Sequence, residues 1–185
     1  MAFASRFCSN RSLSCNLGVI HVNIRKRRLT ALSVMLCLLP FAAPAADRKA
    51  AELARGRYVA LIAGCNACHT EGFAPSAGKV PQSQWLMGSA VGMRGPWGTT
   101  YPPNLRIYMQ GVTADQWVKT AKTAEMRPPM PWFDLHEVSE PDLRALYAFV
   151  RSLGAPGAPA PAYLPPGQDP QGPVIVYPAP PPGKP

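Results

Sequence analysis

Acidic side chains are scarce in this chain, and none precedes Asp47. The 185 residues include 10 Asp and Glu against 19 Lys and Arg, a formal net charge of +9. Such a balance suggests a nucleic-acid or membrane-surface partner. Six of the basic residues, however, precede Leu29, and the chain from Asp47 onward has 13 basic against 10 acidic residues. The basic character therefore belongs to the N-terminal segment, and the rest of the chain gives no support for nucleic-acid binding.

The chain also lacks an uninterrupted apolar run of about 20 residues, the length that a membrane-spanning helix requires. Residues 29–46 come nearest, but two prolines interrupt them, and they follow the basic run 25–28. A basic segment, an apolar segment and the small residues at 43–45 are typical of a cleaved secretory signal. We predict a signal peptide over residues 1–45 and a protein of the Gram-negative periplasm; an uncleaved membrane anchor is the alternative.

Cysteine and histidine are few, and the predicted signal contains Cys8, Cys15 and Cys37. The mature chain keeps Cys65 and Cys68, in the sequence Cys65-Asn66-Ala67-Cys68-His69. This is the attachment pattern of a c-type haem, in which each thiol adds across one vinyl group and the histidine binds the iron. We predict one covalent haem c, bound by Cys65 and Cys68, with His69 as proximal ligand.

A methionine is the best candidate for the sixth iron ligand. Met130 lies between prolines in Arg127-Pro-Pro-Met-Pro131, a rigid extended segment that can fix a sulfur without a helix. Met126 and His136 are alternatives, as are the other methionines or an open sixth position. Methionine opposite histidine raises the reduction potential relative to a second histidine. We predict Met130 as the second axial ligand.

Other side chains are expected around the haem. Arg94 and Arg106 could pair with its propionates or lie on the solvated surface. The aromatic residues expected to line the haem or its propionates are Trp97, Tyr101, Trp132 and Phe133.

Helical periodicity occurs in three segments, which predicts an all-α domain. The helix expected over 47–64 contains Gly56, which indicates that another helix crosses closely there, with Tyr147 lying across the glycine. Thr113 and Gln116 form a capping box for a helix over 113–124, and Ser139 opens the helix over 139–153. Residues 104–110 could add a short helix.

The remaining segments are rich in glycine and proline. The aperiodic stretch 70–111 is too long for an ordinary loop of a compact domain, and a haem would supply the apolar surface around which it wraps. Residues 155–185 hold 12 of the 23 prolines and should form an extended tail. The apolar patch 174–177 within it could add as an edge strand to this domain or to a partner. We therefore predict a signal over 1–45, a haem domain over 46–154 and a tail over 155–185.

Four segments resemble the exported monohaem cytochromes c that serve as electron-accepting partners or subunits of bacterial dehydrogenases. They are Arg55-Gly-Arg-Tyr58 ahead of the haem motif, Gly-Thr-Thr-Tyr-Pro-Pro-Asn-Leu over 98–105, Arg-Pro-Pro-Met-Pro-Trp-Phe-Asp-Leu over 127–135, and the last helix. Related segments recur three times in the cytochrome subunits of membrane alcohol and gluconate dehydrogenases. The resemblance implies the cytochrome c fold, with terminal helices crossing near the haem, and His69 and Met130 as axial ligands. One departure is Arg106, because those cytochromes continue with Thr-Pro after the Asn-Leu pair.

The expected function is single-electron transfer by a Fe(II)/Fe(III) cycle, from a dehydrogenase to a cytochrome or oxidase of a respiratory chain, without catalysis of a bond change. A membrane would be met only through a partner or an uncleaved leader. An open-site haem enzyme, such as a peroxidase, or a gas-binding haem protein is the alternative. A dithiol oxidoreductase or a zinc module is a third possibility, although a zinc site would need further ligands.

Overall fold

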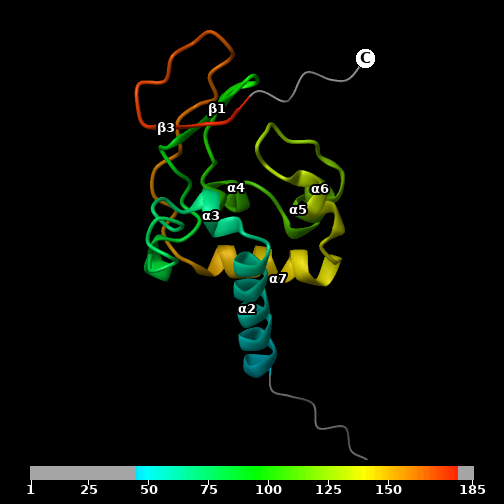
Figure 1. The fold of residues 1–185 in the computed structure, drawn as a ribbon. Helices are drawn as coiled ribbons and strands as arrows, with labels where there is room; N and C mark the ends of the chain where they lie inside the picture. The colour runs from blue at the N-terminus through cyan, green and yellow to red at the C-terminus, as the bar shows by residue number, and fades with distance from the viewer. Residues whose placement is uncertain (1–44, 179–185) are drawn as a thin grey trace, which may run out of the picture. The chain divides into compact units, whose positions relative to one another are not determined.

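Figure 1 shows the computed structural model, which describes residues 45–178. The predicted signal peptide lies outside the described residues, except for Ala45. The helices are α2 (Ala45–Ile62), α3 (Cys65–His69), α4 (Leu105–Gln110), α5 (Ala114–Thr123), α6 (Trp132–Glu137) and α7 (Glu140–Ser152). A 3-10 turn, η1, covers Gln82–Gln84, and the strands are β1 (Gly92–Gly95), β2 (Gly98–Thr100) and β3 (Val174–Val176). None of the helices within residues 45–178 is long and apolar enough to cross a membrane.

The two longest helices, α2 and α7, cross at Gly56 (Figure 1). A Cβ atom added at Gly56 would overlap the backbone carbonyl oxygen of Ala145 and come within 2.6 Å of the Phe149 Cβ. The crossing that the sequence predicts at Gly56 is therefore present, but Tyr147 does not lie across it. The Tyr147 hydroxyl instead donates to the carbonyl oxygen of Val112 at 2.9 Å.

The buried side of α2 is narrow and consists of Gly56, Val59 and Ala60. Val59 and Ala60 are buried beside Gly56, whereas Tyr58 and Ile62 are exposed, the latter to 63%. Close approach to α7 selects the small side chains around Gly56, and the larger ones are left on the outer side.

The predicted starts of α5 and α7 are confirmed. The Thr113 hydroxyl and the Gln116 side chain form a reciprocal capping box at α5. The Ser139 hydroxyl accepts from the Asp142 amide at 3.3 Å, and Asp142 also receives Arg55 of α2 in a bidentate pair at 2.6 and 3.0 Å. The same residue thus helps to begin α7 through its amide and joins α7 to α2 through its carboxylate.

A small sheet adds to the expected all-α architecture. Its strand order is β2-β1-β3, with β1 antiparallel to β2 and parallel to β3. Met93 of β1 lies opposite both Thr100 and Ile175. The apolar patch over 174–177 therefore adds as an edge strand to its own domain. Sequence periodicity missed β1 and β2 because both strands are short and contain glycine.

The hydrophobic core joins the helices to the loop that follows α3. Trp85 and Leu86 come from this loop and are almost fully buried; the Trp85 ring meets Phe73 at 5.7 Å and Phe149 at 6.4 Å between centroids. From the helices the core receives Val59, Ala60, Met109, Trp117, Ala121, Leu135, Leu143, Leu146, Phe149 and Val150. The loop is thus held partly by protein side chains, in addition to any surface that a cofactor supplies.

Arg106 holds three segments together from within the domain. Arg106 is only 2% exposed, and all five N–H donors of its guanidinium group bind backbone carbonyl oxygens. The acceptors lie in the loop around η1 and at the end of α7: Gln82, Ser83, Trp85, Leu153 and Ala155, at 2.8 to 3.2 Å. Burial lowers the pKa of Arg106 from its usual value, but a guanidinium remains charged at neutral pH.

We expect Gly56→Ala to destabilise the protein by about 1–3 kcal/mol, because the added methyl group overpacks a contact with backbone that cannot rotate away. The control is Ala51→Ser on the exposed side of α2, which should change the free energy of unfolding by less than about 0.5 kcal/mol. Denaturant unfolding followed by circular dichroism measures both. Equal stability of the Gly56 and Ala51 variants would contradict the crossing.

We expect Arg106→Met to cost at least about 3 kcal/mol, because it leaves several buried carbonyl oxygens without a donor. Arg106→Lys should rescue little, since an ammonium lacks the planar fork that reaches these five acceptors. Arg94→Met is the matched control: Arg94 pairs with the exposed Asp169 at 2.7 Å, and such surface pairs contribute about 1 kcal/mol or less. The same unfolding experiment decides, and an Arg106→Met variant no less stable than Arg94→Met would contradict this role.

Candidate haem site

Cys65 and Cys68 lie on α3, a single short helix that follows α2 after a tight turn. Gly64 makes the turn with a left-handed backbone, φ 67°. Residues three apart in a helix lie on neighbouring positions of one face, so α3 presents both sulfurs to the same side. Both cysteines are free and half-buried. Two unbridged thiols on one helical turn are compatible with two thioether bonds to one haem.

The environment of these thiols disfavours dithiol chemistry and zinc binding. Burial raises the pKa of Cys65 to about 11 and also raises that of Cys68. A redox dithiol needs a thiol of lowered pKa, because the thiolate is the nucleophile. Within residues 45–178 no three His, Cys, Asp or Glu side chains gather as a metal-binding cluster, whereas structural zinc requires four ligands.

His69 ends α3 and is buried, with 7% of its surface exposed. Its Nδ1 lies 2.8 Å from the carbonyl oxygen of Pro103. A carbonyl oxygen can only accept, so Nδ1 carries the proton and Nε2 keeps its lone pair, the form in which imidazole binds a metal. Burial lowers the pKa of His69, which also favours the neutral ring. The donor set of Cys65, Cys68 and His69 therefore fits a c-type haem.

The loops behind His69 are fixed by short hydrogen bonds. The Thr70 hydroxyl donates to the Asn66 side chain at 2.7 Å and accepts from the Leu86 amide at 2.7 Å, and the Gly88 amide donates to the His69 carbonyl at 2.8 Å. A Cβ at Gly88 would lie 2.8 Å from the Pro102 oxygen and 2.9 Å from the Asn104 nitrogen. The segments 86–88 and 102–104 are thus packed backbone against backbone, which places the Pro103 carbonyl at the imidazole.

Pro103 belongs to the site through its carbonyl oxygen, which binds His69, and it was not among the residues predicted from the sequence. Its sequence signal is Pro102-Pro103 directly before Asn104, whose side chain caps α4 by accepting from the Arg106 and Ile107 amides. Two prolines ahead of a helix cap interrupt regular pairing, so a carbonyl there is available to a side chain.

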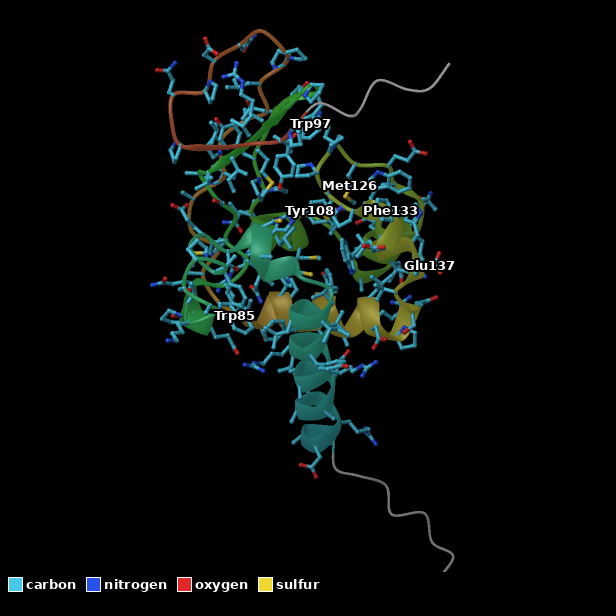
Figure 2. All side chains as sticks on the ribbon, viewed as in Figure 1. Trp85, Trp97, Tyr108, Met126, Phe133 and Glu137 are labelled. Carbon is cyan, nitrogen blue, oxygen red and sulfur yellow. The ribbon has the colours of Figure 1, made fainter. Side chains whose placement is uncertain are left out.

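The loop between α5 and α6 carries the methionines considered as axial ligands. Met126 and Met130 are half-buried and pack against the core cluster. The Met130 amide donates to the Arg127 carbonyl at 3.2 Å, and the Met130 carbonyl accepts from the Trp132 amide at 2.9 Å. Figure 2 labels Met126 on this loop and Phe133 on α6, away from Trp85 in the loop after α3.

His136, the alternative ligand, lies in the last turn of α6. Its Nε2 is 3.2 Å from the Ala124 carbonyl oxygen, its ring centroid is 5.0 Å from that of Trp132, and its own carbonyl accepts from Lys122 at 2.6 Å. These contacts give His136 a structural role between α5 and α6.

The charged and aromatic residues expected near the haem have several environments. Arg106 is buried and binds five carbonyl oxygens, so it is neither solvated surface nor free to pair with a propionate. Arg94 lies nearer the surface and pairs with the exposed Asp169. Tyr101 is buried, and the Trp97 indole donates to the Met93 carbonyl at 3.3 Å. Phe133 is 58% exposed and packs against Trp132.

Comparison with known proteins shows the family to which this domain belongs. Residues 53–154 match the family described as Cytochrome c. The chain is also 29% identical, over 121 residues, to a fructose dehydrogenase cytochrome subunit of Gluconobacter japonicus. This match covers 60% of the chain and 23% of the relative's own length. No solved structure gives a match. Since the family match covers more than half of the sequence, the chain belongs to the cytochrome c family.

Proposed function

We propose that this protein is an exported one-electron carrier with a single haem c bound by Cys65 and Cys68. The observation that carries the proposal is the geometry of His69, whose Nδ1 is bound by the Pro103 carbonyl at 2.8 Å directly after the paired thiols. This arrangement leaves Nε2 as the ring nitrogen for iron. A c-type haem bound here would supply an iron that alternates between the ferrous and ferric states.

The chain's own residues have distinct roles in this proposal. Cys65 and Cys68 would hold the porphyrin covalently, so that the cofactor would be retained in both oxidation states. His69 would bind the iron, and the Pro103 carbonyl keeps the imidazole ring from rotating. Met130 would be the second iron ligand and, as a thioether, would favour the reduced state more than a second histidine would. A ligand set that is complete in both states is suited to electron transfer and leaves no position for a substrate.

We further propose that the electron donor is a dehydrogenase and that the acceptor is a cytochrome or oxidase of a respiratory chain. The support is the similarity to a dehydrogenase cytochrome subunit together with the resemblance of the four sequence segments. The basic and apolar segments before residue 46 support export to the periplasm, with cleavage close to residue 45, a haem domain over 46–154 and a proline-rich tail over 155–185.

Covalent attachment is tested by replacing the cysteines. Wild type should stain for haem on a denaturing gel and show the reduced absorption spectrum of a c-type haem. Cys65→Ala with Cys68→Ala should abolish the stain, since no thioether bond can form. Wild-type protein without covalent haem would contradict the proposal.

The sixth ligand is tested by Met130→Ala. The near-infrared sulfur-to-iron band of the oxidised protein should disappear and the reduction potential should fall, because the thioether is lost. Met126→Ala and Met87→Ala are controls and should retain the band. A band that survives in Met130→Ala but is lost in Met126→Ala would transfer the ligand to Met126. Rapid binding of carbon monoxide by the reduced wild type would favour the open-site enzyme instead.

A further inference from the structure

The segment 155–178 returns from the end of α7 along the loops that precede α4. The Asn104 side chain donates to the carbonyl oxygens of Pro156 and Ala158 at 2.6 and 2.9 Å. Farther along, Leu164 pairs with Thr99 through both backbone hydrogen bonds, at 2.8 and 3.0 Å. The segment then ends in β3, beside β1. It is therefore fastened to the domain before, at and after Tyr163.

Tyr163 is held rigidly by these neighbours. Its hydroxyl donates to the Trp97 carbonyl at 2.7 Å, and the next residue, Leu164, carries the paired backbone bonds to Thr99. Gly98 allows this approach, because a Cβ there would overlap the Leu164 carbonyl oxygen and lie 3.0 Å from the Pro165 carbonyl carbon. The half-buried ring of Tyr163 thus has a fixed position relative to the turn between β1 and β2.

The ring of Tyr163 meets the loop that carries Met130. The guanidinium carbon of Arg127 lies 4.1 Å from the Tyr163 ring centroid, a cation–π contact. Arg127 is three residues before Met130, and its carbonyl accepts the Met130 amide at 3.2 Å. The same residue therefore contacts the tail through its side chain and Met130 through its backbone.

We propose that Tyr163 is a positioning residue that holds the Met130 loop closed through Arg127, so that the tail limits opening of the sixth position of the iron. This inference rests on the proposed role of Met130. The tail then acts on the haem site of its own chain, rather than serving only as a covering or as a docking strap for a partner.

Binding of added imidazole to the oxidised holoprotein measures how often the Met130 loop opens. Imidazole must replace Met130, so its apparent dissociation constant falls in proportion as the open fraction rises. An exposed cation–π contact corresponds to about a two- to five-fold change in that fraction. We expect Tyr163→Leu to lower the apparent dissociation constant about two- to five-fold, while Tyr163→Phe, which keeps the ring, stays within about twofold of wild type.

Two further variants make the experiment specific. Tyr177→Leu is the matched control, because it also removes a tail aromatic, one that packs on Trp97 at 5.7 Å, without touching Arg127; its imidazole affinity should equal that of wild type. Arg127→Gln should reproduce Tyr163→Leu from the other side of the contact. The double variant should add nothing to either single change, because both remove one interaction. Arg127→Gln also keeps the test decisive if Tyr163→Leu does not fold.

Hydrogen exchange of residues 124–131 gives a readout that does not depend on ligand binding. These amides should exchange faster in Tyr163→Leu than in Tyr177→Leu, because the loop opens more often. The inference would be overturned if wild type, Tyr163→Leu and Arg127→Gln had equal imidazole affinity and equal exchange rates. In that case the near-infrared band would still show Met130 as the ligand, so the proposed function would stand. Loss of the Met130 assignment itself would appear separately, as a band that persists in Met130→Ala.

Discussion

The five hydrogen bonds of the Arg106 guanidinium join the loop around η1 to the beginning of α4 and the end of α7. A domain with a long irregular loop must satisfy many backbone carbonyls away from water, and a planar cation with five donors does so from one position. Two nearby contacts also join a side-chain nitrogen to a backbone carbonyl oxygen: His69 binds the carbonyl of Pro103, and Asn104 binds that of Pro156 in the tail. The short segment 103–106 therefore connects the haem motif, the loop and the tail.

This arrangement gives the proposed haem site a rigid backbone support. The crossing of α2 and α7 at Gly56 positions α3, which directly follows α2. Segments 86–88 and 102–104 pack backbone against backbone next to His69. The imidazole is then oriented by a backbone carbonyl rather than by a carboxylate. A neutral partner of this kind leaves less negative charge beside His69, the proposed iron ligand, than a carboxylate would.

The tail has a larger part in the domain than its composition indicates. Prolines prevent helix and central strand, yet residues 155–178 supply acceptors to Asn104, a paired residue to Thr99, an aromatic ring to Arg127 and a third strand to the sheet. An extended chain exposes its backbone groups along its whole length, so it can bind several loops in turn. In this protein it spans the loops on which both proposed axial ligands depend.

The haem motif and the starts of α5 and α7 could be predicted because each depends on residues close together in the chain. The crossing at Gly56 could be predicted because a glycine inside a helix lowers its stability unless another segment needs the space. The sequence did not determine which residue covers Gly56, which side of α2 is buried, or that Arg106 would lie inside rather than at a propionate. Those outcomes depend on contacts between distant segments, whose partners no local pattern specifies. The sheet is the clearest case. β1 and β2 are too short to be recognised alone, and the apolar patch over 174–177 could be recognised as a strand but without its partner, which the tertiary structure supplies by bringing residues 174–176 beside 92–95.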